Sequence, residues 1–101
     1  MLVESAMKNT TAYTKIINYF KEKPVHKIMV FGSYALNKQK PSSDIDVLLS
    51  LDHPVGLLAL SGYRIELEKL LGIKVDLGTE NGVSSYVMPY IKKDAVVIYE
   101  K

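Results

Sequence analysis

The 101-residue sequence contains no cysteine and has only a small net charge. Without cysteine the chain has no disulfide bond and no thiolate metal site, which is compatible with a reducing compartment. Its 13 Lys and Arg residues stand against 11 Asp and Glu residues, a net charge of +2, and the longest basic run is the pair Lys92-Lys93. We therefore expect no strong nucleic-acid binding, because a general nucleic-acid-binding protein carries a basic patch or stripe.

The sequence also lacks long apolar segments. None of its apolar stretches approaches the roughly 20 residues that a membrane-spanning helix needs. No basic segment followed by an apolar one stands at the N-terminus, which argues against a signal peptide. We expect a cytoplasmic protein that does not enter a membrane. Its length suits a single domain over residues 1–101, with 1–9 as a disordered lead-in of little periodicity.

The rest of the sequence alternates helical and strand patterns. Apolar residues at helical spacing indicate amphipathic helices, and short apolar runs indicate buried strands. This alternation predicts an α/β fold, a small mixed β-sheet flanked by helices. The expected elements are a helix from Thr10 or Thr11 that stops before Pro24, a strand at 26–31, a short helix at 33–37, a strand at 45–51, a helix begun by Asp52-His53-Pro54 and capped by Gly72, a strand at 73–77, a short helix at 83–92 ended or bent near Pro89, and an edge strand at 95–99. The apolar stripe of the helix before Gly72 is expected to comprise Leu57, Leu60, Tyr63, Leu67, Leu70 and Leu71.

Residues 32–46 are the most informative segment of the chain. Gly32-Ser33 follows an apolar run, ten residues intervene, and Asp44 and Asp46 lead into the next apolar run. Side chains two residues apart on a strand point to the same face, so the two aspartates project together. Neighbouring carboxylates repel each other, and we expect a cation between them. Oxygen ligands of this kind suit Mg²⁺, and substrate phosphates and water complete its coordination shell.

The Gly32-Ser33 pair is expected to lie where a strand passes into a helix. Glycine lets the backbone approach a phosphate closely, free N–H groups at a helix start attract anions, and the Ser33 hydroxyl can donate to a phosphate oxygen. Together with the aspartates this indicates metal-dependent phosphoryl or nucleotidyl transfer. The simpler alternatives are that Asp44 and Asp46 form a solvated strand end and that Ser33 only caps the helix.

The spacing of Gly-Ser, ten residues and Asp-x-Asp resembles the signature of the DNA polymerase β-type nucleotidyltransferases. The closest likeness is to their smallest members, the minimal nucleotidyltransferases paired with HEPN-domain proteins. That family has a third aspartate on a later strand, and this chain has Asp76 within Val75-Asp76-Leu77. The resemblance covers about Val25 to Tyr99 and implies the nucleotidyltransferase fold. Taken alone, Asp76 before Leu-Gly could also begin a turn.

The resemblance implies a role for each residue of the site. Asp44, Asp46 and Asp76 would be catalytic and would hold two Mg²⁺ ions, one at the attacking hydroxyl and one at the leaving pyrophosphate. The Gly32-Ser33 turn would grip the triphosphate of a nucleoside triphosphate, with ATP favoured by the family likeness.

Two further residues near the turn have open roles. Ser43 would contact a phosphate or hold its own loop, and the sequence favours neither. Tyr34, beside Gly-Ser, could lean on the nucleobase, although packing is the simpler interpretation.

The sequence departs from the family pattern at two positions. Members commonly carry Arg-Gly three and four residues after the serine, where this chain has Leu36 and Asn37. This change removes a cation near the phosphates and affects the expected catalytic efficiency. Lys38 and Lys40 on the following loop could compensate, but a solvated loop lysine is the simpler interpretation.

Two functions of different classes are consistent with these residues. The first is an Mg²⁺-dependent enzyme that transfers a nucleoside monophosphate, AMP from ATP by family likeness, to a hydroxyl of a protein partner. The resemblance implies a HEPN-domain partner, which would supply the acceptor surface, and an antitoxin role. The second is a catalytically weak or inactive module that neutralises the same partner by contact, as the missing Arg-Gly favours. A transferase for small ligands is a weaker third hypothesis, and the oligomeric state, a homo-oligomer included, is left open.

Overall fold

The computed structural model describes the backbone of residues 4–101 and the side chains of residues 10–101. The elements in chain order are α1 (Glu4–Phe20), β1 (Val25–Phe31), α2 (Gly32–Ala35), β2 (Ile45–Leu51), α3 (Leu57–Leu71), β3 (Val75–Thr79), the 3₁₀-helix η1 (Glu80–Gly82), α4 (Met88–Asp94) and β4 (Val96–Glu100).

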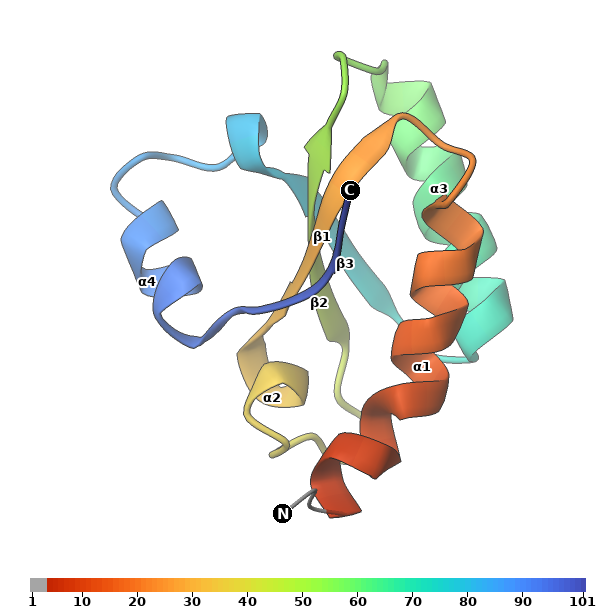
Figure 1. The fold of residues 1–101 in the computed structure, drawn as a ribbon, viewed down its shortest axis with the longest axis vertical. Coiled ribbons are helices and arrows are strands. Elements are labelled where there is room, and N and C mark those ends of the chain that lie inside the picture. Colours follow the sequence, from red (N-terminus) through yellow and green to blue (C-terminus); the bar gives the residue numbers. More distant parts are fainter. Residues whose placement is uncertain (1–3) are drawn as a thin grey trace.

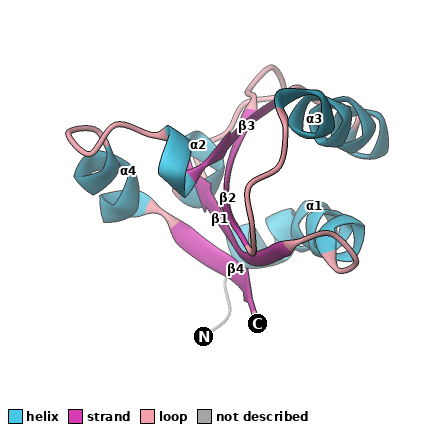
Figure 2. Ribbon diagram, turned by 90° about the horizontal axis from the view of Figure 1, so that it is seen from above, coloured by secondary structure: helices cyan, strands magenta, loops and turns pink. Residues whose placement is uncertain are grey.

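The four strands form one sheet in the order β3-β2-β1-β4. β2 and β3 run parallel, whereas β1 is antiparallel to both β2 and β4. The helices α1 and α3 lie side by side on one face of the sheet, and α2 and α4 lie toward the other (Figures 1 and 2). The predicted α/β fold with a small mixed sheet flanked by helices is therefore confirmed. No helix in the described part of the chain is both long and apolar enough to cross a membrane.

The alternation of side chains along β2 fixes the core and the direction of Asp46. Ile45, Val47 and Leu49 on one face of β2 are buried under α1 and α3, so Asp46 points to the opposite face. Leu48 on that opposite face is also buried, which confirms the predicted coverage of both faces at the centre of the strand. A slip by one residue would bury Asp46 and expose the core residues, so this register is strongly specified. The core cluster comprises Ile16, Phe20, Val25, Ile28, Val30, Ile45, Val47, Leu49, Leu67 and Val75.

Helix α1 is longer than the sequence predicted. It begins at Glu4 instead of Thr10 or Thr11 and ends at Phe20, ahead of Pro24 as expected. Most of the predicted lead-in 1–9 is therefore helical backbone, while residues 1–3 lie outside the described residues.

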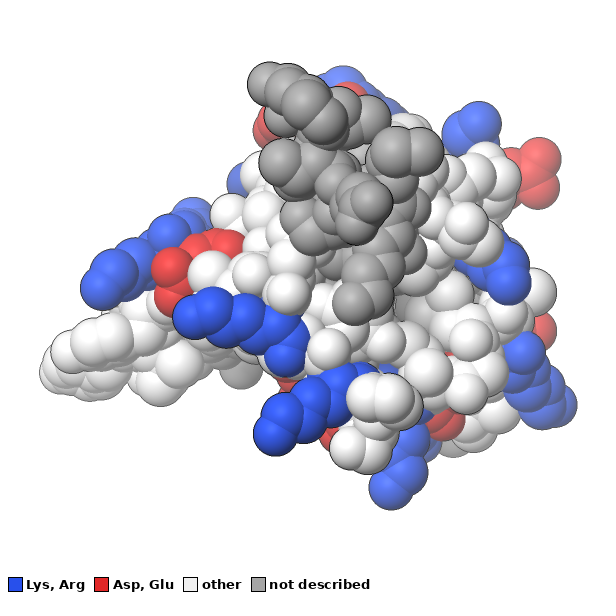
Figure 3. Space-filling view, turned by 90° about the horizontal axis from the view of Figure 1, so that it is seen from below, with Lys and Arg blue, Asp and Glu red and all other residues white. Residues whose placement is uncertain are grey.

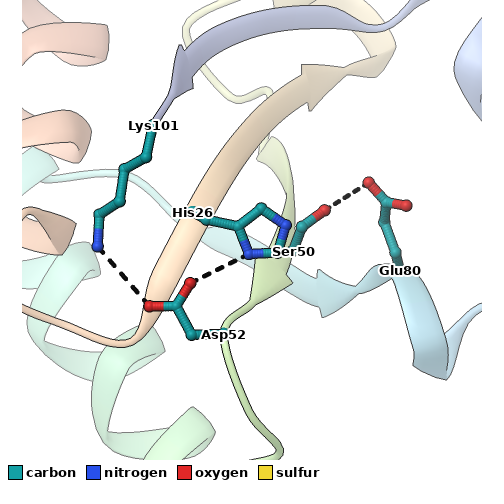
Figure 4. A network of polar contacts seen from close by, with 5 residues as sticks. All are labelled: His26, Ser50, Asp52, Glu80 and Lys101. Atoms are coloured by element: carbon teal, nitrogen blue, oxygen red, sulfur yellow. Dashed lines mark hydrogen bonds and ion pairs between the residues drawn. The ribbon is translucent and has the colours of Figure 1, made fainter.

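The predicted start of α3 at Asp52-His53-Pro54 is wrong. The helix begins after Gly56, which makes no side-chain capping bond. The Asp52 carboxylate instead contacts His26 Nδ1 at 3.1 Å and Lys101 Nζ at 3.7 Å (Figure 4). These partners lie far from Asp52 in the sequence, so it joins β1 and the end of β4 to the loop after β2 and is not available as a cap.

The apolar stripe of α3 is narrower than predicted. Leu67 is fully buried and Tyr63 and Leu71 pack against the core, but Leu57 is 83% exposed and Leu70 is 49% exposed. The predicted C-terminal cap is confirmed: Gly72 has φ +72° and its N–H donates to the Glu68 carbonyl.

The C-terminal part of the chain follows the predicted order with shifted boundaries. Strand β3 lies two residues later than the expected range 73–77. The short helix also starts later, because Pro89 stands in the first turn of α4 and begins the helix instead of ending it. The last strand lies at the sheet edge, as predicted.

A side chain of α3 fixes the start of β3. Glu68 Oε2 accepts a hydrogen bond of 2.9 Å from the backbone N–H of Val75, and Glu68 Oε1 contacts Arg64 Nη1 at 3.3 Å. The predicted Arg64–Glu68 pair is thereby confirmed. The bond to Val75 has the larger structural consequence, because it secures the residue next to Asp76.

We predict that Glu68→Ala lowers the free energy of unfolding by about 1–3 kcal/mol, the cost of leaving the Val75 N–H without an acceptor. Arg64→Ala should cost no more than about 0.5 kcal/mol, because it removes only an exposed ion pair. Glu68→Gln is the matched control, since its amide oxygen can still accept from Val75. Urea unfolding measures all three, and equal losses for Glu68→Gln and Glu68→Ala would contradict this account.

Candidate active site

The parallel ladder between β2 and β3 places Asp46 directly beside Asp76. Asp44 lies in the loop that enters β2, two residues before Asp46. The sequence predicted that the third aspartate would come alongside the first two, and the register brings Asp46 and Asp76 together on the face opposite α1 and α3. The three carboxylates thus come from one end of two adjacent strands.

The electrostatics of Asp46 reflect this crowding. Its pKa is raised from 3.8 to about 6, first by burial and then by the negative charges of Asp76 and Asp44 and a hydrogen bond with Asp76. A carboxyl group with this surrounding is costly to ionise, and a nearby cation would reverse the effect. The pair of side chains is therefore an electrostatic site for a positive charge.

Asp44 is less closely engaged than the other two aspartates. It acts on Asp46 through its charge, whereas Asp76 also shares a hydrogen bond with Asp46. Within the side chains of residues 10–101, no group of three or more His, Asp or Glu residues is already gathered as a metal site. The donor set nevertheless fits Mg²⁺ by its chemistry, because carboxylate oxygens on adjacent strands are hard ligands and two of them already meet.

The close approach of Asp46 to the backbone explains why residue 32 is glycine. Gly32 has φ +73°, a left-handed conformation that side chains disfavour. A Cβ placed on Gly32 would also overlap Asp46 Oδ2. The turn between β1 and α2 therefore forms a cradle that the Asp46 carboxylate fills, and the Gly-Ser turn and the Asp-x-Asp strand meet in space.

Ser33 follows Gly32 in the first turn of α2. The N-cap of α2 is Phe31, which makes no side-chain capping bond, so Ser33 is not the helix cap that the simpler alternative required. Its carbonyl accepts a 2.8 Å hydrogen bond from the Lys38 N–H, which closes the segment after α2. The structure thus leaves the phosphate-binding prediction for the Ser33 hydroxyl in place.

Ser43 has a structural partner in its own loop. Its hydroxyl oxygen accepts a 2.8 Å bond from the Lys40 N–H, and its own N–H donates to the Lys40 carbonyl. This geometry favours the loop-holding role, and contact with a phosphate stays a prediction. Beside Asp44 the loop borders an open groove of about 270 Å³ that also includes Lys74.

The two positions that depart from the family pattern differ in their consequence. Asn37 has φ +56°, which explains how it replaces a glycine, because asparagine tolerates the left-handed region better than most residues. Leu36 is 45% exposed and carries no charge in place of the arginine. Asparagine is therefore compatible with the left-handed backbone at residue 37, while the cation at residue 36 is lost.

The structure assigns no binding role to the remaining residues near the turn. Tyr34 is half-buried and packs against the core, and its carbonyl accepts from the Tyr13 hydroxyl. Lys38 and Lys40 are on the α2–β2 loop, where Lys38 is exposed. Viewed from the end of the molecule where β2 begins, Lys and Arg side chains surround the visible face with acidic groups between them (Figure 3). Leu36 stands at the position of the family's arginine, and no ion pair of Lys38 or Lys40 with the aspartates is present among the described side chains.

Sequence reasoning missed Glu68 as part of the support of this site. Its bond to Val75 N–H holds the backbone at the residue before Asp76. In the sequence it carried only the helical spacing to Arg64, and nothing in a single sequence indicates a bond from a helix to the following strand.

Comparison with known proteins identifies the family. The family model described as "Nucleotidyltransferase domain" matches residues 14–99. A Methanocaldococcus jannaschii protein named as a candidate protein adenylyltransferase is 49% identical over 69 residues, 68% of this chain and 67% of the relative. The protein adenylyltransferase MntA of Thermococcus cleftensis is 32% identical over 74 residues, 73% of this chain and 75% of the relative.

Solved structures show the same fold. A toxin–antitoxin crystal structure with AMP-PNP has a TM-score of 0.81 and 22% identity, with 88% of this chain and 73% of that chain covered. A structure of tri-AMPylated Shewanella oneidensis HEPN toxin in complex with MNT antitoxin has a TM-score of 0.76 and 19% identity, with 92% and 73% covered. The predicted resemblance is confirmed: this chain belongs to the nucleotidyltransferase family of enzymes, among its minimal members.

Proposed function

We propose that this chain is an Mg²⁺-dependent protein adenylyltransferase that transfers AMP from ATP to a hydroxyl of a partner protein and acts as its antitoxin. The observation that carries the proposal is the register that sets Asp46 beside Asp76, next to Asp44 and over Gly32. The names of the relatives support the adenylyl donor and the protein acceptor.

Asp44, Asp46 and Asp76 are the residues that would hold the metal, with two Mg²⁺ ions as the family resemblance implies. Bound there, the ions would supply positive charge for the phosphoryl oxygens and would acidify the attacking hydroxyl. The raised pKa of Asp46 supports this assignment, because burial and the charges of Asp76 and Asp44 make its carboxylate costly to ionise and a cation between the carboxylates would offset that cost.

The chain's own residues bind and orient the substrates. The Gly32 backbone and the Ser33 hydroxyl would contact the triphosphate, since the turn faces the aspartates and Ser33 is not needed as a cap. Asp76 comes from β3, an edge strand of the sheet. Its carboxylate would accept the proton of the acceptor hydroxyl as the bond to the α-phosphorus forms.

A HEPN-domain protein is the proposed partner. The solved structure of a HEPN toxin bound to an MNT antitoxin has the same fold as this chain, and that toxin carries AMP. The proposal extends this pairing to the present chain.

Inhibition by contact alone is the second candidate function. Leu36 favours it, because the family's arginine at this position would contribute a cation near the phosphates. The three aspartates favour the enzyme, because clustered carboxylates repel each other and destabilise a protein that does not bind a cation between them.

We predict that the aspartate cluster destabilises the metal-free protein at neutral pH. The pKa of Asp46 is higher in the folded chain, about 6, than its usual 3.8, so its favourable contribution is complete below about pH 4 and is lost as the pH rises through about 6. In EDTA, the free energy of unfolding of Asp46→Asn minus that of the wild type should therefore increase by about 1 kcal/mol from pH 4 to pH 7, after allowance for solvent screening.

Urea unfolding of both proteins at the two pH values measures this difference. Mg²⁺ at neutral pH should narrow the difference by stabilising only the wild type. A stability difference that does not change with pH would contradict the raised pKa of Asp46 in the folded chain.

The proposed function predicts transfer of label to the partner protein. Incubated with ATP labelled at the α-phosphate, Mg²⁺ and its HEPN-domain partner, the wild type should label the partner and release pyrophosphate. Asp46→Asn is nearly isosteric and should fold. Its rate of label transfer should fall at least about a hundredfold, because the substitution removes one of the three negative charges that would hold the metal.

Protection of cells against the partner separates the two candidate functions. The enzyme account expects protection by the wild type and none by Asp46→Asn. Equal protection by both would establish inhibition by contact.

A further inference from the structure

Two of the seven tyrosines present almost the whole side chain to solvent. Tyr86 is 86% exposed and Tyr90 is 78% exposed, whereas the other five are half-buried. The Tyr13 hydroxyl donates to the Tyr34 carbonyl, and the Tyr19 hydroxyl donates to Glu66. Tyr86 and Tyr90 are thus the phenols that a second molecule can reach most readily.

The segment that carries these tyrosines stands at the edge of the molecule. Helix α4 lies away from α1 and α3 and packs against α2, the helix that begins with Gly32-Ser33 (Figures 1 and 2). None of its residues is fully buried. An enzyme molecule can therefore approach Tyr90 without disturbing the core of the acceptor copy.

The surroundings of Tyr90 differ from those of Tyr86 in charge. Lys93 follows Tyr90 by three residues in α4, a spacing that places two side chains next to each other on a helix. Lys92 is 3.9 Å from Glu80, but no ion pair of Lys93 is recorded among the described side chains. Tyr86 has Pro89 and Tyr90 at the corresponding positions. Tyr86 lies before the start of α4, so the helical spacing to Lys93 holds for Tyr90 alone of the two. A phosphate attached to Tyr90 would therefore have a cation beside it on the same helix.

We propose that Tyr90 is a self-modification site, adenylylated by a second copy of this chain. The inference rests on the proposed adenylyltransferase activity and adds an acceptor to it. The Tyr90 phenolic oxygen attacks the α-phosphorus of ATP in the second copy, and the bond from that phosphorus to the pyrophosphate breaks. The phenolic proton passes to a carboxylate of the second copy's aspartate cluster and then to solvent. The products are adenylylated Tyr90 and pyrophosphate.

Phenol chemistry supports this acceptor. A phenolic hydroxyl is more acidic than the hydroxyls of serine and threonine, so less activation is needed to make it a nucleophile. An exposed side chain on a short surface helix also meets a second active site with little loss of packing.

The test uses the purified chain with ATP and Mg²⁺, read by intact and tandem mass spectrometry. The wild type should gain one adenylyl group, located on Tyr90. Tyr90→Phe should reduce the label by roughly tenfold or more, because only the nucleophilic oxygen is lost. Tyr86→Phe is the matched control, because Tyr86 is also largely exposed but lies outside the helix that carries Lys93, and this variant should keep the label. Label that survives Tyr90→Phe, or that lies on Tyr86, would overturn the proposal.

A mixture of two variants tests transfer between copies. Asp46→Asn has the acceptor but lacks the candidate metal ligand, and Tyr90→Phe has the ligand but lacks the acceptor. Their different masses identify which copy gains AMP, and only the Asp46→Asn copy should be labelled. Absence of label on that copy would overturn transfer between molecules.

The HEPN-domain partner, added to parallel samples, separates this inference from the proposed function. A wild type that labels the partner but not itself overturns the Tyr90 assignment and leaves the enzyme intact. A wild type that labels neither overturns both.

Discussion

The repulsion between two carboxylates held side by side is the constraint around which this small domain is arranged. The parallel register of β2 and β3 pairs Asp46 with Asp76, and burial together with the neighbouring charges raises the pKa of Asp46 to about 6. A fold that placed these groups together by chance would be expected to relax them apart. Here the absence of a side chain at Gly32 leaves room for the Asp46 carboxylate, and Glu68 accepts a hydrogen bond from the Val75 N–H, next to Asp76.

The core explains why this strained arrangement persists. The buried side of β2 is anchored beneath α1 and α3, and each fully buried aliphatic side chain contributes about 1.5–3 kcal/mol. These contributions outweigh the repulsion at Asp46, and the pleat of the strand leaves Asp46 no other direction than the face shared with Asp76. The buried side of β2 thus holds Asp46 in place, whereas α2 and α4 on the other side of the sheet have no fully buried residue.

Much of the site was predictable because its residues are close in sequence or have strong patterns. The apolar run around Asp76 predicted the strand that brings it alongside Asp46. The prediction that Asp44 and Asp46 share one face of a strand is not tested by this register, because β2 begins at Ile45 and Asp44 lies in the preceding loop. The features that failed depend on distant contacts. Asp52 was expected to cap α3, but His26 and Lys101 bind it. The bond from Glu68 to Val75 leaves no pattern in the sequence. Asn37 was seen as a departure from the family, and only its positive φ shows that asparagine is compatible with the backbone at this position.

Direct observation of metal at the aspartates tests the central claim of this account. In crystals grown with AMP-PNP and Mn²⁺, anomalous scattering should reveal two Mn²⁺ ions about 3.5–4 Å apart. Asp44 and Asp46 should contact both ions, and Asp76 should contact one of them. Bound nucleotide with no anomalous peak at these carboxylates, or a peak that involves none of the three, would contradict the account.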